Sequence, residues 1–446
     1  MTRHRIGTAI VAGFLLAVSL AIPAVARPDE PATVIKAGRL FDSEKGTFVA
    51  DRYITIRKNR VVSVDAAKPA EKGARFIDLG RYTILPGLID SHTHLLYLEG
   101  VGPGSGGLSQ ESLKAIVFEG DALRALRGAA RAKTFLDAGI TTVQDLGNSG
   151  QFADVALRRA IDEGSVPGCR MRVSGPGLST PGGQIPGVAF KHLPLTTDEY
   201  RIVRGPEDAV TAVREAVVMR VDVIKIYSDS APNVGRLSVE EMAAVVGEAH
   251  RYGLRVAAHA VADRSVRDAA LAGVDSIEHA YSVSDETIQL LKEKNVTVVP
   301  TLLSSDAFER YMEISGETDK GAVAAQFRTM QAQSRDVLGR LMKAGIPIAS
   351  GSDEYLDLHM PQGQAAKKVI YAFTECGMSV IEALASATVT AARHLRLENR
   401  IGVIKAGAFA DLIAVEGDLE KDIRVLDNIR FIMKDGVVYR DAPGPR

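Results

Sequence analysis

Apolar and polar positions follow two different rhythms along this chain. Residues 33–80 and 399–446 alternate apolar and polar side chains over short runs that turn residues interrupt, such as TVIKAGRLFD and IRFIMKDGVVYR. Alternation with a period of two is typical of half-buried β-strands. Both ends of the chain are therefore predicted to be β-structure, and we expect them to pair in one small β-sandwich.

Between these ends, brief apolar runs alternate with amphipathic segments of helix length. Eight runs are predicted to be buried strands, at 84–90, 140–146, 171–175, 221–227, 254–260, 274–280, 296–302 and 346–353. Several follow an Ala-Gly turn, namely Ala138-Gly139, Ala272-Gly273 and Ala344-Gly345. Strands that alternate with helices pair in parallel, so the pattern predicts an α/β fold with a closed (β/α)8 TIM barrel. An open doubly wound sheet is the alternative.

The first 26 residues follow neither rhythm. Arg3, His4 and Arg5 precede the apolar run IGTAIVAGFLLAVSLAI, which the small residues at 24–26 follow. This order predicts a signal peptide that is cleaved after Ala26, and hence a secreted or periplasmic protein. An uncleaved membrane anchor is the alternative, but the run is short. We therefore expect no stable membrane anchor after the signal is removed.

The predicted organisation has three parts. Residues 1–26 are the signal peptide, residues 27–80 and 399–446 form the β-sandwich domain, and residues 81–398 form the barrel. A length of 446 residues agrees with two folded units, because one core seldom grows past about 300 residues. Whether the protein forms a homo-oligomer stays open at this level.

Charge balance and cysteine content bear on the partners and the disulfides that the chain can have. Lys plus Arg number 54 and Asp plus Glu number 55, so the chain offers no excess positive charge for a nucleic acid, and we expect none as a partner. The two cysteines, Cys169 and Cys376, are too few for a disulfide framework and have no CxxC spacing. A single disulfide between them stays open.

Candidate metal ligands stand at the ends of the predicted strands. In a (β/α)8 barrel, catalytic side chains project from the carboxyl ends of the strands. Those ends carry His92, His94, Lys225, His259, His279 and Asp353. His92 and His94 are two residues apart on an extended strand, so both imidazoles face the same side. Alone this HxH spacing is a weak signal, but four further ligand types at equivalent ends predict a metal centre.

Lys225 is the most informative of these residues. Burial beside a dication lowers the pKa of a lysine, and the neutral amine can add carbon dioxide and become an anionic carbamate that bridges two metals. The alternative is a simple ion pair with Asp222 or Asp229 at a strand end. Since a two-metal site needs a bridging anion, we predict that Lys225 is carboxylated on N6.

Several stretches are most informative when they are taken together: PGLIDSHTH, the strand around Lys225, His259, His279, the GSD that ends in Asp353, and SATVTAARHLRLENRIGVIKAGAFADLIAV. Together they resemble the amidohydrolase superfamily over essentially the whole mature chain. The chain is most similar to the binuclear branch that holds Xaa-Pro dipeptidases, imidazolonepropionase-like proteins and ochratoxin-hydrolysing amidases.

This resemblance implies two divalent metal ions, with zinc expected. It implies that His92, His94, Asp353 and carboxylated Lys225 bind one ion, and that Lys225, His259 and His279 bind the other. One stretch departs from the branch. Where its members carry a GGH sequence after the third strand, this chain has PGGQ, ending in Gln184.

A mechanism follows from these residue types. A hydroxide between the metals is expected to attack an amide carbonyl, while Asp353 takes its proton and delivers it to the leaving nitrogen. Tyr227, two residues past Lys225, is a candidate donor to the developing oxyanion, with a packing role as its alternative. The candidate contacts to a substrate carboxylate are Tyr227, Gln184, His192 and Arg264.

The predicted function is that of an exported binuclear zinc amidohydrolase. We expect a dipeptidase-like metallopeptidase that cleaves dipeptides or N-acyl amino acids, with Xaa-Pro or a hydrophobic C-terminal residue, or ochratoxin-type amides. Hydrolysis of a cyclic amide or a phosphoester on the same metals is the alternative. A non-enzymatic binding protein is a third interpretation. Binding alone would not require a carboxylated lysine.

Overall fold

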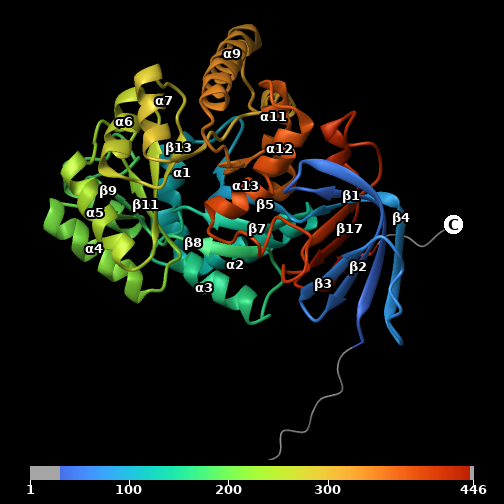
Figure 1. Ribbon diagram of the computed structural model, residues 1–446. Helices are drawn as coiled ribbons and strands as arrows, with labels where there is room; N and C mark the ends of the chain where they lie inside the picture. Colours follow the sequence, from blue (N-terminus) through green and yellow to red (C-terminus); the bar gives the residue numbers. More distant parts are fainter. Residues whose placement is uncertain (1–30, 442–446) are drawn as a thin grey trace, which may run out of the picture.

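Strands from the two chain ends lie side by side in the computed structural model (Figure 1), which describes residues 31–441. The predicted signal peptide lies outside the described residues. The strands follow the order β18-β17-β16-β4-β1-β2-β3 in one sheet. Their bounds are β1 (Thr33–Asp42), β2 (Thr47–Arg57), β3 (Arg60–Asp65), β4 (Arg75–Pro86), β16 (Leu412–Val415), β17 (Ile429–Lys434) and β18 (Val437–Arg440).

The pairing of the two chain ends is confirmed. β4 from the N-terminal part pairs with β16 from the C-terminal part, antiparallel, with Ile84 opposite Ala414. The sheet bends until its edge strand β3 reaches the segment before β16, where the Val61 amide donates to the Ala408 carbonyl at 2.9 Å. Within the described residues all seven strands belong to one hydrogen-bonded sheet, so a sandwich of two sheets stays a prediction.

The middle of the chain forms parallel sheets. One has the order β5-β7-β8 and the other β10-β9-β11-β12-β13-β14, and all their pairs are parallel. The bounds are β5 (Leu88–Thr93), β7 (Ile140–Asp145), β8 (Arg170–Val173), β9 (Gly177–Ser179), β10 (Tyr200–Ile202), β11 (Val223–Tyr227), β12 (Arg255–Ala260), β13 (Ser276–His279) and β14 (Thr297–Val299). The short strands β6 (Glu99–Gly100) and β15 (Leu356–Asp357) pair separately. The fold is therefore α/β with parallel sheets.

The eighth predicted strand is not a regular strand. Residues 346–353 contribute one isolated bridge, from Ile348 to Val298 of β14. The same segment also reaches β5, because the Ser91 amide donates to the Ser350 carbonyl at 2.7 Å. On the other side, the Asp222 amide donates to the Val173 carbonyl at 2.8 Å and so links the two parallel sheets. Closure into an eight-stranded barrel stays a prediction that these bonds support.

Helices follow the parallel strands and cover their outer side (Figure 1). Their bounds are α1 (Gly107–Lys114), α2 (Gly120–Asp137), α3 (Ala153–Asp162), α4 (Pro206–Val218), α5 (Val239–Arg251), α6 (Asp263–Ala272), α7 (Asp285–Glu293), α8 (Ser305–Ile314), α9 (Lys320–Ala344), α10 (Gln362–Lys367), α11 (Val369–Glu375), α12 (Val380–Ser386) and α13 (Val389–His394). A π-helix, η1 (Ala115–Glu119), and two 3-10 helices, η2 (Phe190–Asp198) and η3 (Ile423–Asp427), complete the set.

Local sequence sets several of these boundaries. Ser238 begins α5 with a capping box, in which its side chain accepts from the Glu241 amide. Two of the Ala-Gly turns that precede predicted strands also end helices: Gly273 and Gly345 adopt φ values of 90° and 79° directly after α6 and α9. A left-handed residue satisfies the last carbonyls of a helix, and glycine adopts it without strain. The chain can then enter the next strand at once.

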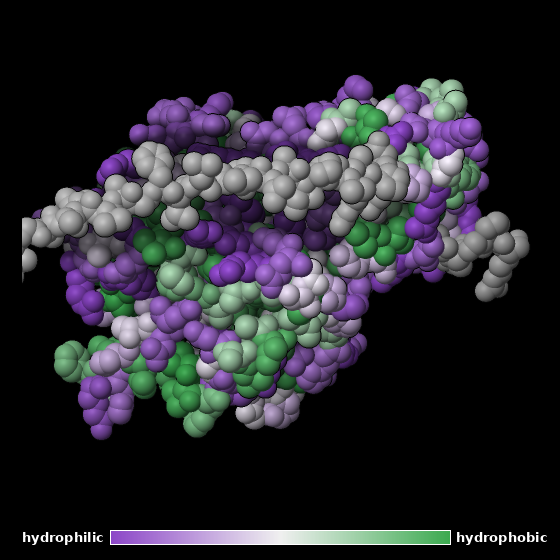
Figure 2. Space-filling model, turned by 90° about the horizontal axis from the view of Figure 1, so that it is seen from below, coloured by the Kyte–Doolittle hydropathy of each residue, from purple (hydrophilic) through white to green (hydrophobic). Residues whose placement is uncertain are grey.

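Other features of the chain concern its cysteines and its surface. Cys169 and Cys376 are both free and buried, so the disulfide that the sequence left open does not form. Among residues 31–441, every helix falls short of the length and apolarity that crossing a bilayer requires. Seen from below, hydrophilic and hydrophobic residues are interspersed over the surface (Figure 2).

Candidate metal centre

A cavity of about 220 Å³ opens at the carboxyl ends of the parallel strands. It is lined by His92, His94, Tyr97, Asn148, Gln184, Lys225, Tyr227, Ala231, Pro232, His259, Val261, His279, Tyr281, Asp353 and Tyr355. All six predicted metal ligands are in this set. They come from β5, β11, β12, β13 and the segment after residue 350, so the fold gathers residues that lie far apart in the sequence.

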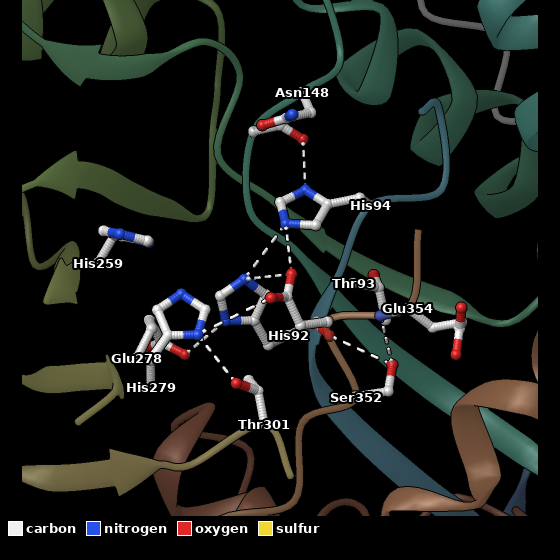
Figure 3. Close-up of polar contacts among 12 residues, drawn as sticks. His92, Thr93, His94, Asn148, His259, Glu278, His279, Thr301, Ser352 and Glu354 are labelled. Atoms are coloured by element: carbon white, nitrogen blue, oxygen red, sulfur yellow. Dashed lines mark hydrogen bonds and ion pairs between the residues drawn. The ribbon is translucent and has the colours of Figure 1, made fainter. Parts of the chain in front are cut away.

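His92, His94 and Asp353 meet on one side of the cavity. His92 lies on β5 and His94 directly follows it, and their Nε2 atoms are 3.3 Å apart (Figure 3). An Asp353 carboxylate oxygen, Oδ1, is 3.0 Å from His94 Nε2 and 3.5 Å from His92 Nε2. His279 joins this group, since ligand atoms of His92, His279 and Asp353 all lie within 4.8 Å of one another.

The outer nitrogens of the HxH pair already have acceptors. His92 Nδ1 is 2.8 Å from Glu278 Oε2, and His94 Nδ1 is 3.1 Å from the Gly147 carbonyl oxygen. Acceptors at these positions hold the ring protons on Nδ1, which leaves both Nε2 lone pairs directed toward the Asp353 carboxylate. Three electron-pair donors that converge in this way repel one another unless a cation lies between them, so the residues fit a divalent metal.

His259 and His279 form the second set of donors, on the neighbouring strands β12 and β13. Their ring centroids are 4.5 Å apart. His279 Nδ1 is 2.8 Å from Thr301 Oγ1 (Figure 3), and His259 Nε2 is 3.4 Å from an Asp229 oxygen. Polar partners thus hold both rings at the cavity, where they are further candidate donors to a metal.

Electrostatics favour the metal-binding form of three histidines and of Asp353, whereas at His94 the effect of burial is outweighed by Asp353, which raises the His94 pKa. Burial lowers the pKa of His92 and His279 well below the ordinary value, and it also lowers the pKa of His259. A neutral imidazole has a free lone pair for a metal. Burial alone raises the pKa of Asp353, but the neighbouring His92 and His94 more than offset it and bring the pKa to about 2. Asp353 is therefore an anion at neutral pH.

Lys225 lies in the cavity wall and is almost completely buried. Burial lowers its pKa to about 8, which leaves part of the amine neutral at neutral pH. The ion pair considered from the sequence is not formed among residues 31–441. Asp222 pairs instead with Arg158 and with Arg172, the latter at 2.9 Å, and Asp229 contacts His259. Lys225 is thus available for the chemistry predicted for it.

The backbone is strained where three of these segments turn into the cavity. His279, Thr301 and Asp353 have φ values of 81°, 46° and 53°, which side-chain-bearing residues adopt at a cost of about 1–3 kcal/mol each. At His279 this turn ends the alternation of β13. As a result Glu278 reaches His92 while the adjacent His279 also lines the cavity, although neighbours on a strand ordinarily face opposite sides.

The predicted substrate contacts divide into two pairs. Tyr227 and Gln184 line the cavity: the Tyr227 hydroxyl donates to Asn148 Oδ1 at 3.2 Å, and Gln184 Nε2 donates to the Ala231 carbonyl at 2.9 Å. His192 and Arg264 are not among the residues that line this cavity, so their contact with a substrate stays a prediction. His192 is exposed on η2, and the Arg264 side chain, 72% exposed in the first turn of α6, faces Asp268.

The sequence did not predict the residues that contact the histidine rings or the tyrosines that line the cavity. Glu278 and the Gly147 carbonyl contact the outer nitrogens of His92 and His94, and Thr301 contacts His279 Nδ1. Tyr97, Tyr281 and Tyr355 shape the cavity. Only Glu278 had a signal in the sequence, as a carboxylate inside the buried run VDSIEHA. The others depend on backbone turns and on loops that bring distant residues together.

Comparisons with known proteins agree with this geometry. A model of the amidohydrolase family matches residues 83–440. The chain is 28% identical over 402 residues to ochratoxinase of Aspergillus niger, covering 81% of this chain and 76% of that protein. A solved Xaa-Pro dipeptidase with methionine bound in its active site has a TM-score of 0.77 at 28% identity and covers 92% of this chain and 100% of its own. A prolidase complexed with N-methylphosphonate-L-proline has a TM-score of 0.78 at 27% identity, with the same coverage.

Proposed function

The chain belongs to the amidohydrolase family, and we propose that it is an exported binuclear zinc hydrolase that cleaves the amide bond of dipeptides or N-acyl amino acids. Metal-dependent amide hydrolysis is the activity that its family and its hydrolase relatives assign to it. The observation that carries the finer proposal is the convergence of four imidazoles, one carboxylate and one buried lysine on a single cavity.

The six groups divide into two sets of metal ligands. His92, His94 and Asp353 would hold one ion, and His259 and His279 the other, with N6-carboxylated Lys225 between them. The geometry of the first set supports an ion there, because its Nε2 atoms and the Asp353 carboxylate already converge. A carbamate on Lys225 would also offset the positive charge that two dications bring into a buried site.

In this proposal the metal ions, Asp353 and Tyr227 have separate roles in hydrolysis. When bound, the two ions supply a nucleophilic water at neutral pH and polarise the scissile carbonyl. Asp353 is ionised, so its carboxylate accepts the proton from the attacking water and passes it to the leaving nitrogen. Tyr227, whose hydroxyl lies in the cavity wall, donates a hydrogen bond to the carbonyl oxygen as negative charge develops there.

Relatives support the choice of substrate and the finer architecture. The prolidase complex has a phosphonate derivative of proline as its ligand, and another relative is named ochratoxinase. We therefore place Xaa-Pro dipeptides and N-acyl amino acids with a hydrophobic C-terminal residue first. The proposal includes a closed (β/α)8 barrel at 81–398, a β-domain from residues 27–80 and 399–446, and export by cleavage after Ala26.

Metal analysis combined with a substrate panel tests the proposal. The purified protein should hold two divalent ions per chain, lose hydrolysis of dipeptides and N-acyl amino acids after chelation, and regain it with zinc. Labelling with ¹³C-bicarbonate should give a carbamate signal that Lys225→Ala lacks. One ion per chain with no such signal contradicts the binuclear site. Hydrolysis of cyclic amides or phosphoesters alone would replace the substrate class.

A further inference from the structure

The cavity wall beyond the six predicted metal ligands is made of neutral side chains. They are Tyr97, Asn148, Gln184, Tyr227, Ala231, Pro232, Val261, Tyr281 and Tyr355. Among residues 31–441, no arginine lines this cavity, and Lys225 is its only lysine. Once Lys225 is carboxylated, the wall has no cationic side chain to face the part of a substrate that leaves.

Arg124 and Arg264 do not provide the cationic side chain that the cavity wall lacks. Arg124 is buried beneath the cavity and donates to the Asn148 carbonyl at 2.6 Å, but its charge is taken by Glu199, with contacts of 2.6 and 3.0 Å. Arg264 is largely exposed on α6 and lies beside Asp268. At the cavity, Asp229 adds negative charge, since it accepts from the amide of the lining residue Val261 at 3.1 Å. Among the side chains that line the cavity, a carboxylate that entered would find no free ammonium or guanidinium group once Lys225 is carboxylated.

A carboxylate loses its hydration on entering a buried site, and an ion pair is the usual compensation. Hydroxyl groups provide a different kind of contact. A neutral tyrosine both donates and accepts a hydrogen bond, so it can serve a carboxylate or a carboxamide. Burial raises the pKa of Tyr97, which keeps its hydroxyl neutral. The Tyr355 hydroxyl has no hydrogen-bond partner within the described part of the chain.

We propose that the enzyme does not require a carboxylate on the leaving group, and that neutral N-acyl amides, with an amino acid amide or another neutral amine as the leaving group, are hydrolysed about as well as the free acids. This inference rests on the proposed function and widens its substrate class. In the reaction, water gives its hydroxyl to the acyl carbon, the C–N bond breaks, and the nitrogen leaves with the proton that Asp353 carries.

Matched pairs of substrates test this inference. The metal-loaded enzyme is assayed with dipeptides and N-acetyl amino acids, each as the free acid and as the C-terminal amide, and the cleaved bond is identified by mass spectrometry. We expect kcat/KM for acid and amide to agree within about 10-fold. A site built to pair a charge rejects its neutral analogue far more strongly, so a preference for the acid above about 100-fold overturns the inference. If neither member of any pair is cleaved, the proposed function fails, and the inference fails with it.

A charge placed in the wall gives an independent test. Gln184 Nε2 lies 3.5 Å from His259 Nε2, so Gln184→Lys puts an ammonium group beside the site, and Gln184→Met is a control of similar length without charge. We expect Gln184→Lys to raise the acid-to-amide ratio of kcat/KM at least about 10-fold, the value of roughly one good charge pair, while Gln184→Met leaves the ratio unchanged. If the acid-to-amide ratio of kcat/KM is the same in Gln184→Lys and Gln184→Met, the absence of a cation does not explain why acid and amide react alike. That result would overturn the inference.

Discussion

The buried side chains of the seven-stranded sheet are almost all apolar, whereas those at the carboxyl ends of the parallel strands include imidazoles, carboxylates and a lysine. In the sheet, residues such as Ile54 and Phe431 are fully buried in a cluster of aliphatic and aromatic side chains. At the cavity, His92, Lys225 and Glu278 are buried to the same degree. Burial of apolar area stabilises a fold, while burial of charge costs free energy that partners only partly return.

The difference assigns separate tasks to the two regions. The sheet ties the chain ends together through regular pairing and an apolar core. The cavity concentrates buried charge and the left-handed backbone at His279, Thr301 and Asp353. Strain and buried charge persist in a structure where function requires them. Substitutions in the sheet should therefore affect stability, and substitutions at the cavity should affect activity and metal binding.

The largest effect is expected from Asp353→Asn. The variant keeps the size of the side chain but removes the proton acceptor, so kcat should fall about 10²- to 10⁴-fold. Stability should stay equal or fall, because a folded-state pKa of about 2 means that the neighbours of Asp353 stabilise its anion in the folded protein, and the variant loses this contribution. The checks are kinetics on a dipeptide and a thermal unfolding curve. Activity within a few-fold of wild type would contradict the role assigned to Asp353.

In the sheet, Phe431→Ala should have the opposite signature. The Phe431 ring is fully buried on β17, and the cavity that the change leaves costs about 3–5 kcal/mol of unfolding free energy. kcat below the melting transition should be unchanged. Val62→Ala is the control, since Val62 on β3 is 43% exposed and should lose little. A marked loss of kcat in the folded Phe431→Ala protein would break the separation between the regions.

The sequence predicts some parts of the fold and of the cavity, and other parts it does not. The β-strands of the chain ends were predicted from alternation, and the six cavity residues from their places at strand ends, because both depend on local periodicity. The irregular segment at 346–353 was predicted as a strand because it is apolar, and periodicity does not show where pairing becomes a single bridge. The sequence does not show that Arg264 and His192 lie outside the cavity wall, because the directions of loops and helix starts depend on tertiary contacts.

A smaller effect is expected from Glu278→Gln. The Glu278 carboxylate holds the His92 Nδ1 proton at 2.8 Å and accepts from Ser276 Oγ at 2.7 Å. A carboxamide keeps the shape but holds the ring less firmly and makes His92 a weaker donor. Changes to such partners typically cost about 10–100-fold in metal affinity. Zinc titration of the metal-free protein against a chelator measures this loss of metal affinity. Ser276→Ala is the control, because it keeps the Glu278 carboxylate.

The smallest effect is expected from Arg264→Ala, which tests the boundary of the cavity. The sequence suggested this arginine as a contact to the substrate carboxylate, but its side chain is 72% exposed and its Nε is 3.7 Å from Asp268. An exposed charge away from the binding site changes free energies by about 0.5 kcal/mol or less, which is roughly a 2-fold change in kcat/KM. Gln184→Ala, inside the cavity wall, is the matched comparison and should change kcat/KM more. If Arg264→Ala selectively slowed hydrolysis of free acids by 10-fold or more while amides were unaffected, α6 would turn toward the substrate in solution, and the cavity would have a cation that its present wall lacks.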